Sequence, residues 1–137
     1  MEAFQVHILA ADRNFYEGPC ESMTISTSDG ELGIWANHSP MIAAVQPGTL
    51  RYRIPGQETQ IAAVSPGMVK VENNEVLVLV DSVERPEEID AARAKREADE
   101  AQEAILQKKS RQEYQIAQSN LARALNRLRV SAHRGID

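Results

Sequence analysis

The sequence contains one cysteine, Cys20, among its 137 residues. A single cysteine cannot form an internal disulfide, which is typical of a protein from a reducing compartment. The sequence also shows no basic and apolar leader and no apolar run of about 18 residues, the length that spans a bilayer. The longest apolar runs, MIAAV and VLVLV, have the length of strands. We therefore expect a protein that reaches a membrane only as part of a complex.

The motifs of common catalytic sites are missing as well. SPGMVK lacks the glycine spacing of a phosphate-binding loop, and GELG has no serine between its glycines as a nucleophile elbow would. The histidines His7, His38 and His133 are too scattered to form a metal cluster with one cysteine. Ser39 follows His38, but adjacent residues rarely form the hydrogen bond that joins a nucleophile to its base. The sequence therefore predicts a non-catalytic protein with no metal and no required cofactor.

Basic residues are outnumbered by acidic ones, and the two signs are unevenly placed. The net charge of −5 argues against nucleic acid as a partner. Residues 1–83 carry 4 basic and 10 acidic side chains, whereas residues 105–137 carry 7 basic and 2 acidic ones. The end of this acidic chain is therefore a basic segment.

Residues 1–85 show the two-residue period of β-strands. Alternating apolar residues occur in FQVHIL (Phe4, Val6, Ile8), SMTIST (Met23, Ile25), TLRYRI (Leu50, Tyr52, Ile54) and EVLVLV, which follows the turn pair Asn73–Asn74. The turn signals DG, QPG, IPG and SPG separate these segments. Short strands with regular turns and no intervening helix predict an antiparallel sandwich or barrel rather than a parallel α/β fold.

Residues 86–137 are predicted to form an antiparallel helical hairpin. No glycine or proline occurs between Glu87 and Arg134, and Pro86 with the acids after it suits a first helical turn. Two apolar stripes have helical spacing: Ala91, Ala94, Ala98, Ala101 and Ile105, and then Tyr114, Ala117, Leu121, Ala124 and Leu128. The stripes are out of phase, which predicts a turn near residues 107–112. The alternative is a solvated coiled-coil appendage.

Two motifs resemble one known family. DGELGIWANHSPMIAAVQPGTLR matches the signature of the epsilon subunits of F-type ATP synthases through Gly30, Leu32, Gly33, Ile34, His38, Pro40, Pro47 and Gly48. VERPEEIDAARA matches the family's helix start through Glu84, Arg85, Ile89, Asp90, Arg93 and Ala94, and ALNRLRV follows near the end. Pro86 stands where the family usually has glycine, and Pro66–Gly67 replaces a glycine pair. The sequence is most similar to the bacterial form, with a chloroplast relative as the alternative.

The resemblance implies a β-sandwich and a two-helix regulatory hairpin. Such a subunit binds the gamma subunit and the c-ring in the rotating central stalk. Its extended helices reach the alpha/beta catalytic head and restrain ATP hydrolysis, whereas the compact hairpin binds regulatory ATP. The expected location is peripheral, on the cytoplasmic face of the bacterial plasma membrane or the stromal face of the thylakoid. A free-standing ATP sensor and a coiled-coil adaptor are the alternative functions.

The resemblance also implies three sets of site residues. Glu31 and His38 are expected to face the c-ring, although Trp35 and His38 could instead cap the sandwich. The expected nucleotide residues are Glu84, Ile89, Asp90, Arg93, Ala94, Arg123 and Arg127. The expected inhibitory contact comprises Lys108, Lys109, Arg111, Arg123, Arg127 and Arg129. The acidic Glu100, where some relatives have a base, would weaken nucleotide binding. The alternative for the arginines is pairing with helix acids.

Overall fold

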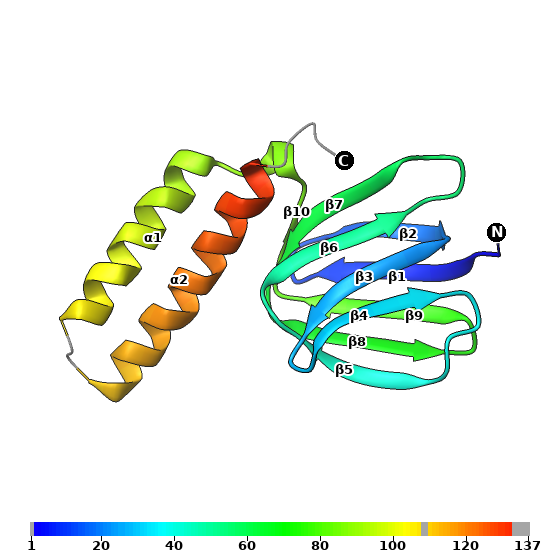
Figure 1. The fold of residues 1–137 in the computed structure, drawn as a ribbon, viewed down its shortest axis with the longest axis horizontal. Coiled ribbons are helices and arrows are strands. Elements are labelled where there is room, and N and C mark those ends of the chain that lie inside the picture. Colours follow the sequence, from blue (N-terminus) through cyan, green and yellow to red (C-terminus); the bar gives the residue numbers. More distant parts are fainter. Residues whose placement is uncertain (1, 108–109, 133–137) are drawn as a thin grey trace. The chain divides into compact units, whose positions relative to one another are not determined.

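The computed structural model describes residues 2–107 and 110–132, and their contacts divide the chain into two compact units. The first unit ends at Arg85 and is built from strands, whereas the second begins at Pro86 and is built from helices. Figure 1 shows the β-sandwich and the pair of helices. The predicted fold class, an antiparallel β-sandwich followed by a helical hairpin, is confirmed.

The strands of the first unit follow one another through short turns. They are β1 (Phe4–Ala10), β2 (Asn14–Cys20), β3 (Ser22–Thr27), β4 (Gly30–Trp35), β5 (Met41–Val45), β6 (Gly48–Arg53), β7 (Thr59–Val64), β8 (Gly67–Glu72), β9 (Glu75–Val80) and β10 (Val83–Glu84). The four segments with an alternating pattern lie in β1, β3, β6 and β9, as expected. Asn73 and Asn74, with φ of 53° and 60°, form the turn between β8 and β9.

The strands are joined in the order β10-β7-β6-β3-β5-β8-β9-β1-β2, with β4 on the side of β3. The ladder between β3 and β5 has one residue pair, Thr27 with Val45, so the sheet folds over at this point. One layer therefore contains β10, β7, β6, β3 and β4, and the other contains β5, β8, β9, β1 and β2. Among the pairings of the described residues, β1 with β9 is the parallel one.

The core of the sandwich comes from the inward positions of both layers. Phe4, Val6 and Ile8 of β1 are at most 2% exposed. The other layer adds Met23 and Ile25 of β3, which are equally buried. Burial of this apolar surface supplies the main driving force for folding. Every buried member of this cluster lies between Phe4 and Val83, so the sandwich has a core of its own.

The second unit contains a 3₁₀ turn, η1 (Pro86–Glu88), and two helices, α1 (Ala91–Leu106) and α2 (Arg111–Ala132). The expectation that the first α-helix begins at Pro86 is wrong. Asp90 has extended backbone, and its Oδ1 accepts a hydrogen bond of 3.0 Å from the backbone N–H of Arg93. A carboxylate in this position caps the first turn, so the α-helix begins after Asp90. Ser110 caps α2 in the same way through the N–H of Glu113.

The helices pack along a seam of small residues. Ala94, Ala98 and Ala101 of α1 are buried, as are Ala117 and Ala124 of α2. This confirms the central part of both predicted stripes. Their ends differ, because Ala91 is exposed and Tyr114 is 40% exposed. A seam of alanines brings the helices close together and leaves no room between them for a phenol ring.

Candidate functional site

The first candidate surface is the turn and strand formed by GELGIW. Gly30 has a φ of +111°, a conformation that side chains with a Cβ rarely adopt. The hydroxyl of Thr27 donates a hydrogen bond of 2.6 Å to the carbonyl of Gly30 and accepts one from the N–H of Asp29. Glycine is therefore required for the backbone path that leads into β4.

Gly33 is required for a different reason. A Cβ at this position would lie 2.7 Å from a ring carbon of Trp35, so the indole occupies the space that a side chain at residue 33 would need. Trp35 remains 54% exposed, whereas Ile34 between the two is buried. Because side chains alternate along a strand, Glu31, Gly33 and Trp35 share the outward face of β4. The suggestion that Trp35 caps the core does not fit this exposure, since the ring lies on the outer face.

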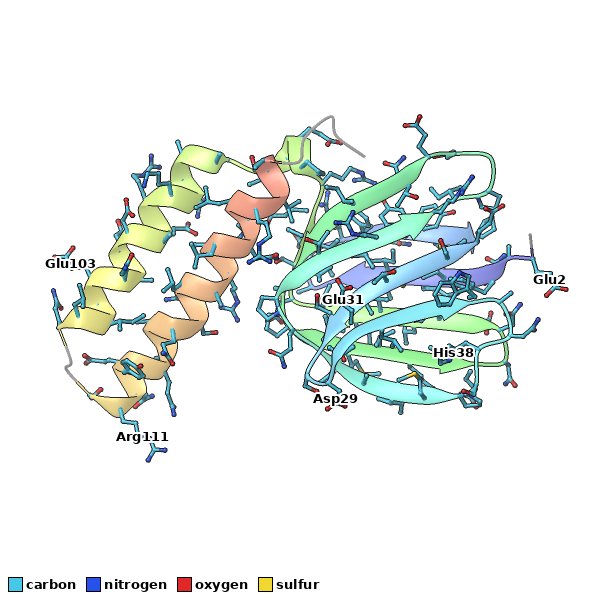
Figure 2. All side chains as sticks on the ribbon, in the orientation of Figure 1. Glu2, Asp29, Glu31, His38, Glu103 and Arg111 are labelled. Atoms are coloured by element: carbon cyan, nitrogen blue, oxygen red, sulfur yellow. The ribbon has the colours of Figure 1, made fainter. Side chains whose placement is uncertain are left out.

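His38 lies beyond the other end of β4. Its Nδ1 is 2.7 Å from the carbonyl oxygen of Ser39, and its backbone N–H donates to the carbonyl of Trp35. Asn37, with a φ of 62°, precedes it, and its backbone N–H donates a hydrogen bond to Asn74 Oδ1. Figure 2 shows Glu31 and His38 at opposite ends of β4, so the structure does not bring these two residues together.

The second candidate surface is the outer face of the layer formed by β5, β8, β9 and β1. In the register of these strands, Ala44, Met68, Leu79 and Leu9 lie in one row. Ile42, Lys70, Leu77 and His7 lie in the next row. Ile42 is 69% exposed and Leu79 is 38% exposed. We call the six apolar members of these rows the apolar outer face: Leu9, Ile42, Ala44, Met68, Leu77 and Leu79.

The apolar outer face is unusual for a solvated sheet surface, where polar residues normally alternate with the buried ones. Hollows of about 360 Å³ and 420 Å³ flank Lys70 on this side of the sandwich. His7 on β1 and Glu17 on β2 form a polar border, with His7 Nδ1 2.5 Å from Glu17 Oε1. Apolar patches with a polar border are typical of surfaces that bind another protein.

The third candidate site is a groove between α1 and α2 with a volume of about 580 Å³. Arg123 and Arg127 line it from α2, while Glu97 and Glu100 line it from α1. Glu97 joins the two helices, because one carboxylate oxygen accepts a hydrogen bond of 2.9 Å from Arg93 Nε and the other lies 3.4 Å from Arg127 Nη1. The sequence alternative that the arginines pair with helix acids therefore holds for Arg93 and Arg127.

The other predicted nucleotide residues are not among the residues that line this groove. Ile89 and Ala94 are buried, at 4% and 2% exposure. The carboxylate of Asp90 is occupied as the cap of α1. Glu84 lies in β10, opposite Ala63 of β7, and so belongs to the sandwich unit. Within the hairpin, Arg93 and Arg127 contact Glu97, and Arg123 lines the same groove.

The predicted inhibitory residues do not form one surface. Lys108 and Lys109 lie outside the described residues. Arg111 begins α2 and is exposed at the turn end of the hairpin (Figure 2). Arg129 is exposed in the last turns of α2, whereas Arg123 and Arg127 line the groove.

Titratable chemistry is sparse in the part of the chain that the structure describes. Its His, Cys, Asp and Glu side chains form no group of three that could hold a metal ion. Cys20 is buried, and this burial raises the pKa of its thiol above the ordinary value. Its Sγ donates to the carbonyl of Ser22. Burial also raises the pKa of Tyr16, with the charge of Cys20 as the second cause. The raised pKa of Cys20 keeps this thiol protonated, which disfavours a reactive thiolate.

The structure also reveals functional candidates that the sequence patterns did not single out. Glu97 was one acid among many in α1, and its partner Arg127 lies 30 residues further along the chain. The apolar outer face had a sequence signal, because MIAAV and VLVLV are apolar at outward positions as well as inward ones. Strands with two apolar faces indicate that both faces are covered in the functional state.

None of the helices within residues 2–107 and 110–132 combines the length and the apolar character needed to cross a membrane. A β-sandwich with an apolar outer face, followed by a helical hairpin with a charged groove, defines an interaction subunit of a larger assembly. The comparisons with known proteins identify that assembly.

Residues 3–86 match the family model of the ATP synthase delta/epsilon chain, beta-sandwich domain, and residues 87–132 match its long alpha-helix domain. The ATP synthase epsilon chain of Ruminiclostridium cellulolyticum is 38% identical over 134 residues, which cover 98% of this chain and 99% of that one. The epsilon chain of Caldanaerobacter subterraneus is 39% identical over 132 residues, or 96% and 95% of the two chains.

A solved chain from the Euglena gracilis mitochondrial ATP synthase has the same fold. Its TM-score is 0.80 at 21% identity, over 90% of this chain and 78% of that one. The chain therefore belongs to the delta/epsilon chain family of ATP synthases. Within that family it is an epsilon-type, non-catalytic subunit of an F-type ATP synthase, as the resemblance of its motifs implied.

Proposed function

We propose that the chain is a rotor subunit of the central stalk, which couples ion flow through the c-ring to ATP synthesis and restrains ATP hydrolysis through its helices. The observation that carries this proposal is the match of both units, in order, to the two domains of one family. The solved Euglena relative comes from an assembly of OSCP, F1 and a c-ring. Within such a complex the chain would lie peripherally on the cytoplasmic face of the bacterial plasma membrane.

The gamma subunit is the partner we assign to the apolar outer face. Ile42 and Leu79 present large side chains to solvent on a sheet that is already packed on its inner side. Covering such a face contributes about 25 cal/mol for each Å² of apolar surface removed from water. A free-standing ATP sensor would need the groove of the hairpin but would have no use for this face, which favours the stalk function.

The c-ring is the partner we assign to the outward face of β4 and to the loop after it. Glu31 and Trp35 are exposed on this strand, and two special glycine positions fix its path. An exposed charge contributes little to folding but can set the specificity of a docking surface. Glu31 at one end of β4 and His38 at the other would then contact separate parts of the ring.

Reversing the charge of Glu31 should impair coupling more than folding. We expect Glu31→Lys to change the free energy of unfolding by about 0.5 kcal/mol or less, because the side chain is exposed. ATP-driven ion pumping by reconstituted complexes should fall while their ATP hydrolysis continues. Glu58→Lys, on the exposed loop between β6 and β7, is the matched control. Normal pumping by the Glu31→Lys complex would remove Glu31 from the interface.

ATP is the ligand we assign to the groove of the hairpin. Arg123 and Arg127 line it, and Arg93 donates to Glu97, which lines it as well. The planar fork of arginine suits phosphate oxygens. The resemblance to the family implies that the base would lie near Ile89 and Ala94, which are buried near the start of α1. Glu100 lines the same groove and would oppose the phosphate charge. The bound nucleotide would favour the compact hairpin and so relieve inhibition.

This assignment predicts that Arg93→Ala weakens ATP binding by about tenfold or more, the usual effect of losing one charge-assisted contact. Isothermal titration of the full chain with ATP measures the change. Arg96→Ala is the matched control, because Arg96 is exposed on the same helix, whereas Arg93 is the arginine of α1 that donates to the groove residue Glu97. The assignment fails if the unaltered chain releases no heat with ATP at millimolar concentrations, or if both variants bind equally.

A further inference from the structure

Glu97 occupies a position in the hairpin that an anionic ligand would need. Its two carboxylate oxygens are divided between Arg93 Nε at 2.9 Å and Arg127 Nη1 at 3.4 Å. Arg93 lies on the same helix, four residues earlier, whereas Arg127 lies on the other helix. The carboxylate therefore neutralises the two guanidinium groups that would otherwise receive phosphate oxygens.

The contact between Glu97 and Arg127 differs from an ordinary surface ion pair. The side chain of Glu97 is 35% exposed and that of Arg127 is 29% exposed, whereas Asp99, paired with Lys95, is 66% exposed. Partial burial weakens the screening of charges by water and salt. The pair also forms only when α1 and α2 are together, so its free energy favours the closed hairpin over separated helices.

The seam beneath this contact is weak by comparison. Ala98, Ala101, Ala117 and Ala124 are small, so each buries little apolar area. Most of the stability of a helix in a protein comes from its packing against other elements. A charge contact that crosses the seam can therefore alter the closing equilibrium measurably.

We propose that Glu97 is an internal anion that latches α1 to α2 and competes with a polyphosphate ligand for Arg93 and Arg127. The competition rests on the proposed nucleotide function, whereas the latch does not. In the absence of ligand, Glu97 holds the hairpin closed by the contacts that phosphate oxygens would make. A ligand binds only the closed hairpin in which Glu97 has been displaced, so the latch lowers the ligand's apparent affinity.

Removal of the Glu97 charge should therefore have two opposite effects. Hairpin closure without ligand should decrease, because the contact to Arg127 is lost. Affinity for a polyphosphate should increase, because the Glu97 carboxylate no longer competes with the ligand for Arg93 and Arg127. A merely structural role of Glu97 would produce the first effect and would weaken ligand binding as well.

The test compares Glu97→Gln with Asp99→Asn in the full chain. Both variants remove one negative charge from α1, and both break an i,i+4 ion pair, but Asp99 pairs with Lys95 of its own helix. Hydrogen exchange of the α2 amides without ligand reports closure. Isothermal titration with inorganic tripolyphosphate reports ligand affinity and does not depend on recognition of a base.

We expect the α2 amides of Glu97→Gln to exchange about fivefold faster than those of the unaltered chain, and tripolyphosphate to bind about threefold to tenfold tighter. Asp99→Asn should leave the exchange rate of the α2 amides and the tripolyphosphate affinity within about twofold of those of the unaltered chain. Equal effects of the two variants, or weaker binding by Glu97→Gln, would overturn the proposal. Faster exchange with no tripolyphosphate binding by either protein would reject the competition and the nucleotide function while supporting the latch.

Discussion

An ATP synthase that carries the chain without residues 86–137 is expected to hydrolyse ATP about fivefold faster, or more, than the complex with the full chain. The reason is that the proposed inhibitory contact comes from the helices, whose basic residues would bind acidic surfaces of the catalytic head. The sandwich should survive the deletion, because every buried residue of its core lies between Phe4 and Val83. Assembly with gamma and the c-ring should therefore continue, and so should ATP synthesis.

The measurement is the hydrolysis rate of reconstituted complexes at low ATP, where the compact state is least favoured. A useful companion is the full-length chain with Arg129→Gln, which removes one exposed base of the inhibitory set. This variant should relieve inhibition in part, and raised salt should do the same by screening the contact. Equal rates for the full and truncated chains would contradict the inhibitory function, and failure to assemble would give the helices a structural function instead.

Placing a charge on the apolar outer face should disrupt binding of the gamma subunit. We expect Leu79→Asp to weaken this binding about a hundredfold, because a buried and unpaired carboxylate is costly at an interface. The variant should still fold, since Leu79 points outward and is 38% exposed on β9. Its thermal unfolding should resemble that of the unaltered chain.

Leu106→Asp is the matched control for this experiment. Leu106 is 73% exposed at the end of α1, so the same chemical change is made on an exposed leucine of the other unit. Binding is measured by titrating purified gamma against each full chain. If Leu79→Asp binds gamma as tightly as the control does, the apolar outer face serves another partner.

The sandwich could be predicted well because period-two alternation decides which strand residues are buried. Phe4, Val6 and Ile8 in β1, and Met23 and Ile25 in β3, are buried as the pattern indicates. The fold-over between the layers and the parallel pairing of β1 with β9 could not be predicted, because they depend on contacts between segments far apart in the sequence. Alternation fixes the face of each residue but not the neighbouring strand.

The hairpin was harder to predict in detail because alanine gives a weak signal. Ala91 and Ala94 are both alanines of α1, yet Ala91 is exposed and Ala94 is buried. The start of α1 depends on the cap that Asp90 forms, a local hydrogen bond that competes with the helix-favouring composition of Pro86–Glu88.

The residues of the candidate sites also fall into two groups: those that a local sequence motif marks and those that only the tertiary packing brings together. Gly30 and Gly33 belong to the motif that matches the family signature, and the structure shows why each is glycine: the first has a φ of +111° and the second lies against the ring of Trp35. The cross-helix contact between Glu97 and Arg127 could not be predicted, because many acids and bases of similar spacing occupy the two helices. Only the packing of α1 against α2 selects this pair.

Co-purification from native membranes tests the central claim most directly, that the chain is a subunit of the rotating stalk. An affinity tag on the full chain would be used to recover it after mild detergent extraction, and the recovered proteins would be identified by mass spectrometry. The account predicts that gamma and the c-ring subunit are recovered with the chain, and that the Leu79→Asp variant loses gamma. Recovery of the unaltered chain without gamma and without the ring would contradict it and favour the free-standing sensor or the adaptor.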